Sequence, residues 1–391
     1  MVDRVYLDNA ATTPLSPAVS EAMRPWLEGM FGNPSSMHTT GRVARQAVSL
    51  AREQVASLLA AEPAEVVFTG SGTEADNLAL VGVAETFAPG EFHLVTSAIA
   101  HPAVLSTCDY LTRRGVEVTY LTVNPEGIVE PDALRASLRA TTRLVSVMAA
   151  NNVVGTVQPI TDLARITHDH GALFHTDAVQ AAGKLPIDVR AQSIDLLSIS
   201  SHKLNGPQGI GALYVRKGIE IEPLVHGGGQ ERGLRSGTEN VAGLVGFGRA
   251  AEIARLTLAE ENARLVSLGE RILTGLESSV PNTYLIGDRY RRLPGHLCLG
   301  FRGCEGEAIR LLLALDASGI AASAGSACSA ANAGEPSSVL VAMGFDPIRA
   351  RGSLRLTLGR FNTDADAERL LEVLPHAVDS LRPTTSHPIT A

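Results

Sequence analysis

Apolar, β-branched runs alternate with helical patterns through the first two-thirds of the chain, and this alternation restricts the possible folds more than any other feature. We expect strands at 65–69, 93–96, 117–121, 143–149, 172–176, 195–200 and 211–215. We expect helices between them at 75–84, 102–114, 131–140 and 161–170. Strands and helices that alternate at this spacing predict an α/β fold, with a mainly parallel seven-stranded sheet and helices on both faces. Ligands of such sheets bind at the carboxyl ends of the strands.

The pattern changes in the last third of the chain. Residues 241–279 form one long helical pattern, rich in Ala, Leu, Glu and Arg, which we expect to lead into a second domain. That domain has an α+β pattern, with strands expected at 296–301 and 353–358 and helices at 307–315, 336–343 and 364–374. A chain of 391 residues is also longer than one ordinary core accommodates. We therefore expect a large domain at 15–259 and a smaller one that includes 260–391.

Composition and charge argue against several classes of protein. No run approaches the roughly 18 consecutive apolar residues of a membrane span, and no apolar stretch follows a basic N-terminus, so we expect neither a span nor a signal peptide. The net charge of −8 argues against a surface that binds nucleic acid directly. The four cysteines form no Cys-x-x-Cys pair, which argues against a disulfide framework or a metal site and favours a cytoplasmic location.

Lys203 follows an apolar run and two serines, and it precedes a Gly-Pro turn. A lysine in this position is usually the solvated end of a strand, but here Asp177 follows another predicted strand upstream. Partial desolvation and the neighbouring His202 would lower the pKa of the lysine, which suits a Schiff base with an aldehyde cofactor. Pyridoxal phosphate is such a cofactor, and its ring nitrogen needs an acidic partner, which Asp177 can provide.

A phosphate site is expected where the run Gly70-Ser-Gly-Thr joins a strand to a helix. The backbone amides of Gly72 and Thr73, with the positive end of the helix, can hold a phosphate group. The same four residues also form ordinary loops and helix caps, so the motif alone is weak. Ser200 and His202, beside Lys203, are further candidate donors to that phosphate.

Four other polar residues are candidates for the same site. His101 follows the second strand, where it is either an exposed residue at a helix start or a ring stacked over the cofactor with a titratable nitrogen. Asn152 and Gln180 also follow strands and could reach the substrate carboxylate and the cofactor hydroxyl. Arg355 lies among alternating leucines, where its charge is costly unless it meets an anion such as a carboxylate.

Cys328 lies in a run of Ala, Ser and Gly that extends from 321 to 334. Such small residues bury too little surface to form a packed core, so we expect a mobile loop with an exposed, reactive thiol. The alternative is an incidental surface cysteine. The composition of the flanking residues favours a nucleophile that moves.

Together, these motifs resemble those of the pyridoxal-phosphate-dependent cysteine desulfurases, within the fold-type I, class V aminotransferase superfamily. The matching segments extend along nearly the whole chain: 6–14, 31–38, 71–77, 201–203, 226–238 and 325–329. The resemblance implies a fold-type I architecture in which residues 1–14 join the small domain, which carries the Cys328 loop. It also implies a homodimer.

The resemblance implies a role for each candidate residue. Lys203 is similar to the Schiff-base lysine, Asp177 to the partner of the ring nitrogen and Cys328 to the persulfide carrier. His101 is similar to the stacking acid–base residue, and Gln180 to the donor to the phenolic oxygen. The family's phosphate ligands are matched by Gly72, Thr73, Ser200, His202 and Thr238, and the resemblance implies that Thr238 reaches the phosphate from the partner subunit. The family's ligands of the substrate carboxylate are matched by Asn152 and Arg355.

The implied activity converts L-cysteine to L-alanine, with sulfur passing to Cys328 and then to acceptor proteins for iron–sulfur clusters, thio-cofactors or tRNA thiolation. The long loop around Cys328 resembles the subgroup that delivers sulfur to protein scaffolds. The chain departs from the family at Val153–Val154, where an acidic residue usually follows the second asparagine. Alternatives are a selenocysteine lyase, another class V lyase or aminotransferase, and a protein kept as a platform for partners.

Overall fold

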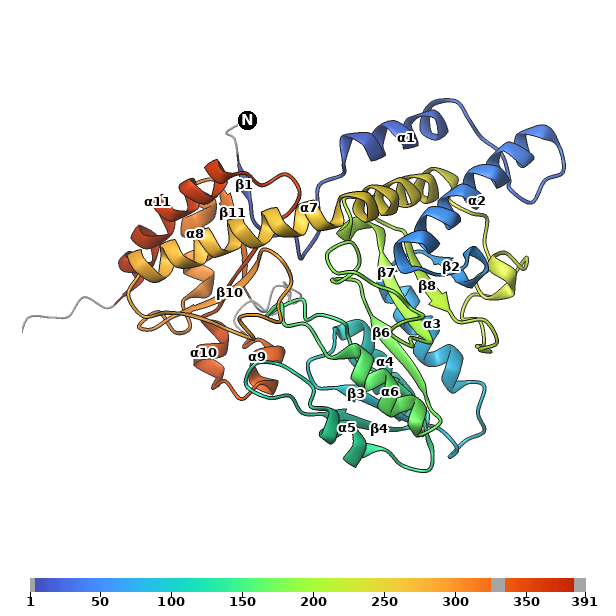
Figure 1. Cartoon of the computed structure of the whole chain (residues 1–391), viewed down its shortest axis with the longest axis horizontal. Helices are drawn as coiled ribbons and strands as arrows, with labels where there is room; N and C mark the ends of the chain where they lie inside the picture. The colour runs from blue at the N-terminus through green and yellow to red at the C-terminus, as the bar shows by residue number, and fades with distance from the viewer. Residues whose placement is uncertain (1–3, 325–334, 383–391) are drawn as a thin grey trace, which may run out of the picture. The chain divides into compact units, whose positions relative to one another are not determined.

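The computed structural model describes residues 4–324 and 335–382 (Figure 1). The chain forms two compact units, each with its own core. The larger unit comprises Ala10–Asn152 and Thr156–Asn262, and the smaller comprises Met1–Asn9, Val153–Gly155 and Ala263–Ala391. The long helix α7 (Val241–Ser279) contributes to both units.

The larger unit contains a seven-stranded sheet in the order β2-β8-β7-β6-β5-β3-β4. Its strands are β2 (Val66–Thr69), β3 (His93–Ser97), β4 (Glu117–Leu121), β5 (Thr142–Ser146), β6 (Leu173–Asp177), β7 (Leu196–Ser200) and β8 (Gly211–Val215). Only β8 is antiparallel to its neighbours, so the predicted mainly parallel α/β sheet is confirmed. The expected strand 143–149 ends early at Ser146, although the amides of Val147 and Ala149 still donate to β6 carbonyls.

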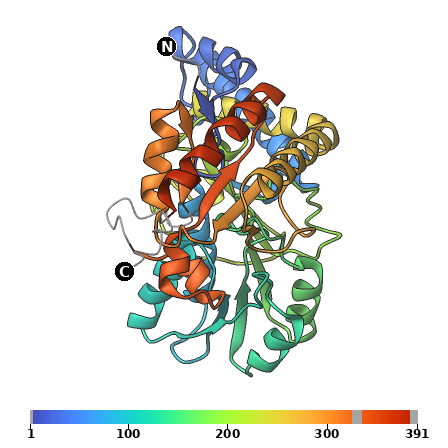
Figure 2. The ribbon, with the colours of Figure 1, turned by 90° about the vertical axis from the view of Figure 1, so that its left-hand side faces the viewer.

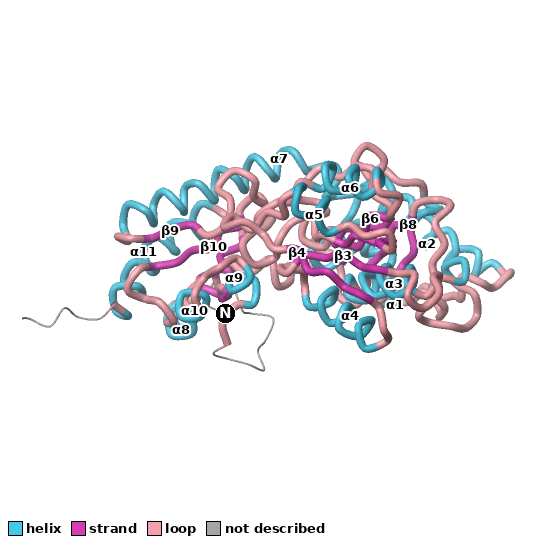
Figure 3. The backbone as a smooth tube through the Cα atoms, turned by 90° about the horizontal axis from the view of Figure 1, so that it is seen from below, coloured by secondary structure: helices cyan, strands magenta, loops and turns pink. Residues whose placement is uncertain are grey.

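Helices cover both faces of this sheet, with α3 and α4 on one face and α5 and α6 on the other (Figure 3). Their bounds are α3 (Gly72–Ala84), α4 (Pro102–Arg113), α5 (Pro131–Ser137) and α6 (Ile160–Asp169). Helix α3 is buried on almost every side, because its Ala, Leu and Val residues pack against β7, β8 and α4. Two helices that the sequence analysis did not predict come first in this unit, α1 (Pro17–Glu28) and α2 (Thr39–Leu59).

The smaller unit has the predicted α+β character. An antiparallel sheet in the order β12-β13-β10-β9 packs against helices, and α8 and α11 lie side by side (Figure 2). The elements of this sheet and its helices are β9 (Thr283–Leu285), β10 (His296–Phe301), β12 (Ser323–Ala324), β13 (Leu354–Thr357), α8 (Ala308–Ala317), α9 (Ser338–Ala342), α10 (Pro347–Arg351) and α11 (Asp364–Leu381). The N-terminal strand β1 (Val5–Tyr6) pairs in parallel with β11 (Ile320–Ala321).

Within the described ranges, 4–324 and 335–382, no helix has the length and apolar character that crossing a bilayer requires. Three of the four cysteines, Cys108, Cys298 and Cys304, are buried free thiols. Burial raises the pKa of Cys108 to about 12 and that of Cys298 to about 11, so neither thiol is a ready nucleophile at neutral pH.

Candidate active site

The ends of three parallel strands bring polar side chains to one edge of the larger sheet. Asp177 is the last residue of β6 and Ser200 the last residue of β7. Lys203 ends η2 (Ser201–Lys203), the 3-10 turn that directly follows β7. His101 follows β3 and caps α4. Because the carboxyl ends of parallel strands meet at one edge, these four side chains belong to one region.

The side chains of Lys203 and Gln180 meet at a shared acceptor. Lys203 Nζ donates to the carbonyl oxygens of Ala10 and Ala11, at 2.5 and 2.6 Å, and Gln180 Nε2 donates to Ala10 O at 2.8 Å. Lys184 Nζ donates to Gln180 Oε1 at 3.3 Å. The segment that begins at Ala10 therefore supplies backbone acceptors at which two predicted site residues converge.

Asp177 is buried, and its surroundings act on the pKa of its carboxyl group in opposite directions. Burial is the main influence and raises the pKa of the carboxyl group. The charge of His101, the amide of Val179 and the charge of Lys203 lower the pKa in return. The amide of Val179 donates to Asp177 Oδ1 at 2.9 Å. The carboxylate thus lies near both His101 and Lys203, although it pairs directly with a backbone amide.

His101 holds a defined ring orientation, because its side chain caps α4. Its Nδ1 accepts a hydrogen bond from the amide of Ala103 at 3.1 Å. A ring nitrogen that accepts carries no proton, so the neutral imidazole has its proton on Nε2. The half-buried ring therefore presents Nε2 as its proton-transfer atom.

The N-terminus of α3 leaves no room for a side chain at Gly72. A Cβ there would lie 2.7 Å from Val179 Cγ2 and 3.3 Å from Ser200 Cβ. Ser71 caps the helix through its side chain, and Thr73 in the first turn is exposed. The amides of Gly72 and Thr73 have no acceptor within the helix because they open it, so they can bind an anion.

The ring of His202 is held by the N-terminal part of the larger unit. Its Nδ1 lies 3.0 Å from Thr12 Oγ1, and its carbonyl oxygen accepts from the amide and the hydroxyl of Thr13. Burial, followed by the charges of Lys203 and Lys184, lowers the pKa of His202 to about 4. The imidazole is therefore neutral at neutral pH, and it can donate to an anion only through Nε2, and only when its proton lies on that nitrogen.

Two predicted site residues belong to the smaller unit. Arg355, in β13, is almost fully buried at 2% exposure and forms a salt bridge of 2.8 Å with Asp8. Its partner in the smaller unit is thus the side chain of Asp8, and its role as a ligand of the substrate carboxylate stays a prediction. Cys328 lies outside the residues that the structure describes, which resume at 335.

Asn152 is buried at the end of a larger-unit segment, and the chain then enters the smaller unit at Val153. There His296 Nε2 lies 2.9 Å from Val153 O, and Arg292 Nη1 donates to Val154 O at 2.7 Å. Val153 and Val154 are buried, and their backbone oxygens accept these hydrogen bonds from His296 and Arg292.

Thr238 is exposed in the glycine-rich loop 226–238 that precedes α7. Glu231 anchors this loop. It is 8% exposed and forms a two-pronged salt bridge with Arg52, with both oxygens at 2.6 Å, and it also accepts from the amide of Phe68 at 2.8 Å. The backbone of the loop is therefore fixed, while Thr238 faces solvent in the single chain.

The sequence analysis missed a buried polar group beside Asp177. Asp76, on α3, and His175, on β6, have 1% and 0% exposure, and their side chains lie 3.7 Å apart. One signal was available, because His175 precedes Asp177 by two residues and so shares its face of the strand. Asp76 gave no such signal, since its position depends on how α3 packs on the sheet.

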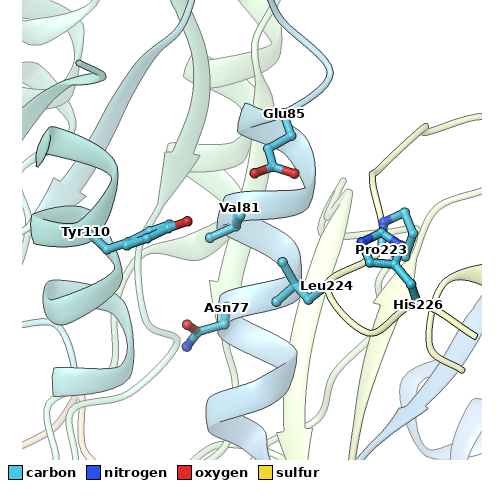
Figure 4. Close-up of a pocket in the computed structure, with 7 residues that line it drawn as sticks. All are labelled: Asn77, Val81, Glu85, Tyr110, Pro223, Leu224 and His226. Atoms are coloured by element: carbon cyan, nitrogen blue, oxygen red, sulfur yellow. The ribbon is translucent and has the colours of Figure 1, made fainter. Parts of the chain in front are cut away.

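A cavity of about 360 Å³ lies elsewhere in the larger unit, between α3, α4 and the segment that leads to the 226–238 loop (Figure 4). Tyr110 of α4 and Val81 of α3 line it, together with Leu224 and His226 of that segment. None of the predicted site residues lines this cavity.

Comparisons with known proteins agree with one another. The family described as aminotransferase class-V matches residues 5–370. A protein named cysteine desulfurase IscS from Methanosarcina thermophila is 49% identical, over 97% of this chain and 93% of the relative. One of the same name from Dictyoglomus turgidum is 47% identical, over 98% of this chain and 96% of the relative. A solved structure named NifS-like protein is 39% identical with a TM-score of 0.90, over 97% of this chain and 100% of the other.

Proposed function

The chain belongs to the class-V aminotransferase family, and from this premise we propose that it is a cysteine desulfurase that uses pyridoxal phosphate. It converts L-cysteine to L-alanine and carries the sulfur on Cys328 as a persulfide. The observation that carries this proposal is the convergence of Lys203, Asp177 and His101 at one edge of the sheet, in a chain similar to cysteine desulfurases along nearly its whole length.

Three observations on the larger unit support the cofactor. Gly72 has no side chain to block the first amides of α3, so a phosphate can approach them closely. Thr73 and Ser200 lie beside these amides. Asp177 is a buried carboxyl group whose second oxygen can accept the N–H of a ring nitrogen. Lys203 is half-buried and meets Gln180 at the carbonyl of Ala10. These residues, with His202 and Thr238, would hold the cofactor.

Pyridoxal phosphate, when bound, supplies an electron sink for the bonds at the substrate Cα. Asp177 keeps a proton on the ring nitrogen, and Gln180 donates to the phenolic oxygen. Lys203 removes the proton from Cα of the substrate and later returns a proton to the product. Asn152 and Arg355 bind the substrate carboxylate.

Sulfur transfer requires a thiolate at Cys328 and a group that handles the substrate's thiol proton. We assign the second role to His101, whose Nδ1 is occupied by the cap of α4 and whose Nε2 is the available atom. The Cys328 thiolate attacks the substrate sulfur, so that an S–S bond forms as the Cβ–S bond breaks. The electron pair of the broken bond stays with Cβ, which takes up a proton and leaves as part of L-alanine.

The persulfide then passes to acceptor proteins, such as a scaffold for iron–sulfur clusters, in the cytoplasm.

We also propose that the protein is a homodimer. Thr238 is exposed in the loop before α7, where it is open to contact by a second copy of the chain. In a dimer, Thr238 of one subunit completes the phosphate site of the other.

The first experiment locates the cofactor and the sulfur. The purified protein should be yellow, and reduction with borohydride should fix the cofactor on Lys203. After incubation with L-cysteine, mass spectrometry should find one added sulfur atom at Cys328 together with released alanine. The Cys328→Ser variant should keep the cofactor and lose sulfur transfer. A keto acid in place of alanine would indicate an aminotransferase, and reduced cofactor on another lysine would contradict the role of Lys203.

A further inference from the structure

A buried group of titratable side chains lies beside Asp177, and the function described above does not use it. His175 and Asp177 lie two residues apart on β6 and share one face of the strand. Ser198 on β7 is the register partner of Asp177, and Asp76 comes from α3, which packs against β7. One helix and two adjacent strands therefore enclose two carboxyl groups and an imidazole.

The imidazole cannot neutralise either carboxyl group. His175 Nδ1 lies 2.8 Å from Ser146 Oγ and Nε2 lies 3.1 Å from Ser198 Oγ, so hydroxyl groups occupy both ring nitrogens. Burial lowers the pKa of His175 to about 3, so the ring is neutral at neutral pH. The contact of 3.7 Å between His175 Nε2 and Asp76 Oδ1 is accordingly a contact between a neutral ring and a carboxyl group.

The two carboxyl groups have different surroundings. Asp177 accepts the amide of Val179 and lies within the electrostatic range of His101 and Lys203, all of which favour its ionised form. Around Asp76, burial raises the pKa of the carboxyl group well above its usual range, and the charge of Asp177 raises it further. Only the hydroxyl of Ser198 acts in the opposite direction.

The contacts of Asp76 show where a proton would be bound. Asp76 Oδ1 is fully buried and has no hydrogen-bond partner among residues 4–324 and 335–382. An ionised oxygen in that position would lack both a donor and a countercharge, which is a costly state in the interior of a protein. A protonated oxygen carries no charge, and the cost of leaving it without a partner is much smaller.

We propose that Asp76 is protonated in the native protein, so that Asp76 and Asp177 together hold a single negative charge and that charge lies on Asp177. The protonated acid fills the space beside the strand ends without adding a second charge. The consequence for the reaction rests on the proposed function, in which Asp177 must be the anion that faces the ring nitrogen. The protonation of Asp76 itself does not depend on that function.

Infrared spectroscopy of the purified protein tests the proposal directly. At neutral pH the wild-type protein should show the C=O stretch of a protonated carboxyl group, and the Asp76→Asn variant should lose it. The matched control is Asp162→Asn, which changes a carboxyl group that is 61% exposed and should leave the band unchanged. A wild-type spectrum without the band at neutral pH would overturn the proposal.

Unfolding by denaturant at several pH values gives a second readout. The folded-state pKa of Asp76 is raised, so the stability that its protonated form contributes is present at low pH and is lost as the pH rises. Because asparagine binds no proton, the Asp76→Asn variant should gain stability relative to wild type between acidic and neutral pH. A relative loss over the same range would mean that Asp76 is ionised.

If Asp76→Asn does not fold, Asp177→Asn supplies the test, because it removes the neighbouring negative charge. The protonated carboxyl band should then disappear at a lower pH than in wild type, and an unchanged pH would refute the coupling of the pair. These readouts need neither turnover nor Cys328. Failure of sulfur transfer with an intact carboxyl band would therefore count against the proposed function and leave the protonation of Asp76 standing.

Discussion

Burial decides the protonation of the imidazoles around the candidate site more than neighbouring charge does. It is the main cause of the low pKa of both His175, at about 3, and His202, at about 4. The two rings remain neutral at neutral pH and serve as hydrogen-bonding groups. His101 is half-buried at the cap of α4, and its proposed role is to exchange protons with the substrate.

The low pKa of His175 predicts a specific loss of stability in acid. Between about pH 6.5 and 3 the unfolded chain binds a proton at this residue and the folded protein does not, so stability falls as the pH falls. From pH 7 to pH 5 this group should cost about 2 kcal/mol of the free energy of unfolding. Urea unfolding of wild type and His175→Gln at both pH values measures the difference. Equal losses in the two proteins would contradict the prediction.

At the residue scale, sequence reasoning found the residues that end strands and missed those that depend on packing. Lys203 and Asp177 could be located because a polar residue after an apolar run marks a strand end, and parallel strands end at one edge. The shared acceptor at Ala10 and the burial of Asp76 arise from contacts between distant segments, which no local pattern encodes. The chemical roles of these residues stay predictions.

At the element scale, the expected strands of the large sheet and four of its helices are confirmed, because their patterns are long and uniform. Helix α2 was missed since its buried positions include Gly41, Ala44 and Ala51, which give a weak apolar period. Small residues at these positions allow a neighbouring helix to pack closely against α2. A Cβ added at Gly248 in α7 would lie 2.6 Å from Ala51 Cα, so the close approach of α7 and α2 depends on this glycine.

Two glycines of α7 should therefore respond to alanine in opposite ways. At Gly248 the new Cβ meets backbone of α2, which cannot move without shifting a helix, so Gly248→Ala should destabilise the protein by about 1–3 kcal/mol. At Gly269 the nearest atom lies at 3.4 Å, an ordinary contact, so Gly269→Ala should stabilise it by up to about 1 kcal/mol through helix propensity. Chemical denaturation measures both. A stabilised Gly248→Ala variant would show that the two helices do not pack as described.

The 226–238 loop depends on one buried ion pair, Glu231 with Arg52. Glu231→Ala leaves the guanidinium of Arg52 without its carboxylate, and it should cost about 3–5 kcal/mol of stability. The control is Glu117→Ala, which removes the partner of Arg139 in a pair that is more than half exposed and should cost less than about 1 kcal/mol. Thermal or urea unfolding compares them. Similar small losses in both variants would mean that the loop is anchored by other contacts.

At the scale of the whole molecule, the smaller unit includes a piece of chain from the middle of the larger one. Arg292 donates to the carbonyl oxygens of Val154, Ile286 and His296, at 2.7, 2.6 and 3.0 Å. Burial lowers the pKa of this guanidinium to about 10, and the carbonyl groups satisfy its donors. Sequence analysis could not place residues 153–155 in this unit, since their attachment uses backbone atoms that every residue has.

The loop at 29–38 supports the proposed dimer. Phe31 and Met37 are 78% and 87% exposed, although the backbone around them is well held. Arg45 Nε donates to Pro34 O at 2.7 Å, and Arg42 Nη1 donates to Met37 O at 2.8 Å. Two large apolar side chains that an ordered loop presents to solvent are typical of a surface that another protein covers.

We therefore expect the double variant Phe31→Glu, Met37→Glu to weaken dimer formation. Burial of a large apolar side chain contributes about 1.5–3 kcal/mol, so losing two of them should raise the dissociation constant by more than about tenfold. Analytical ultracentrifugation over a range of concentrations measures it. The control is Tyr290→Glu, which changes a side chain of 91% exposure in the smaller unit and should leave the dimer intact. Under the proposed role of Thr238 in the partner's phosphate site, the monomeric variant should also bind pyridoxal phosphate more weakly. A wild-type protein that is monomeric at micromolar concentration and fully active would refute the shared site.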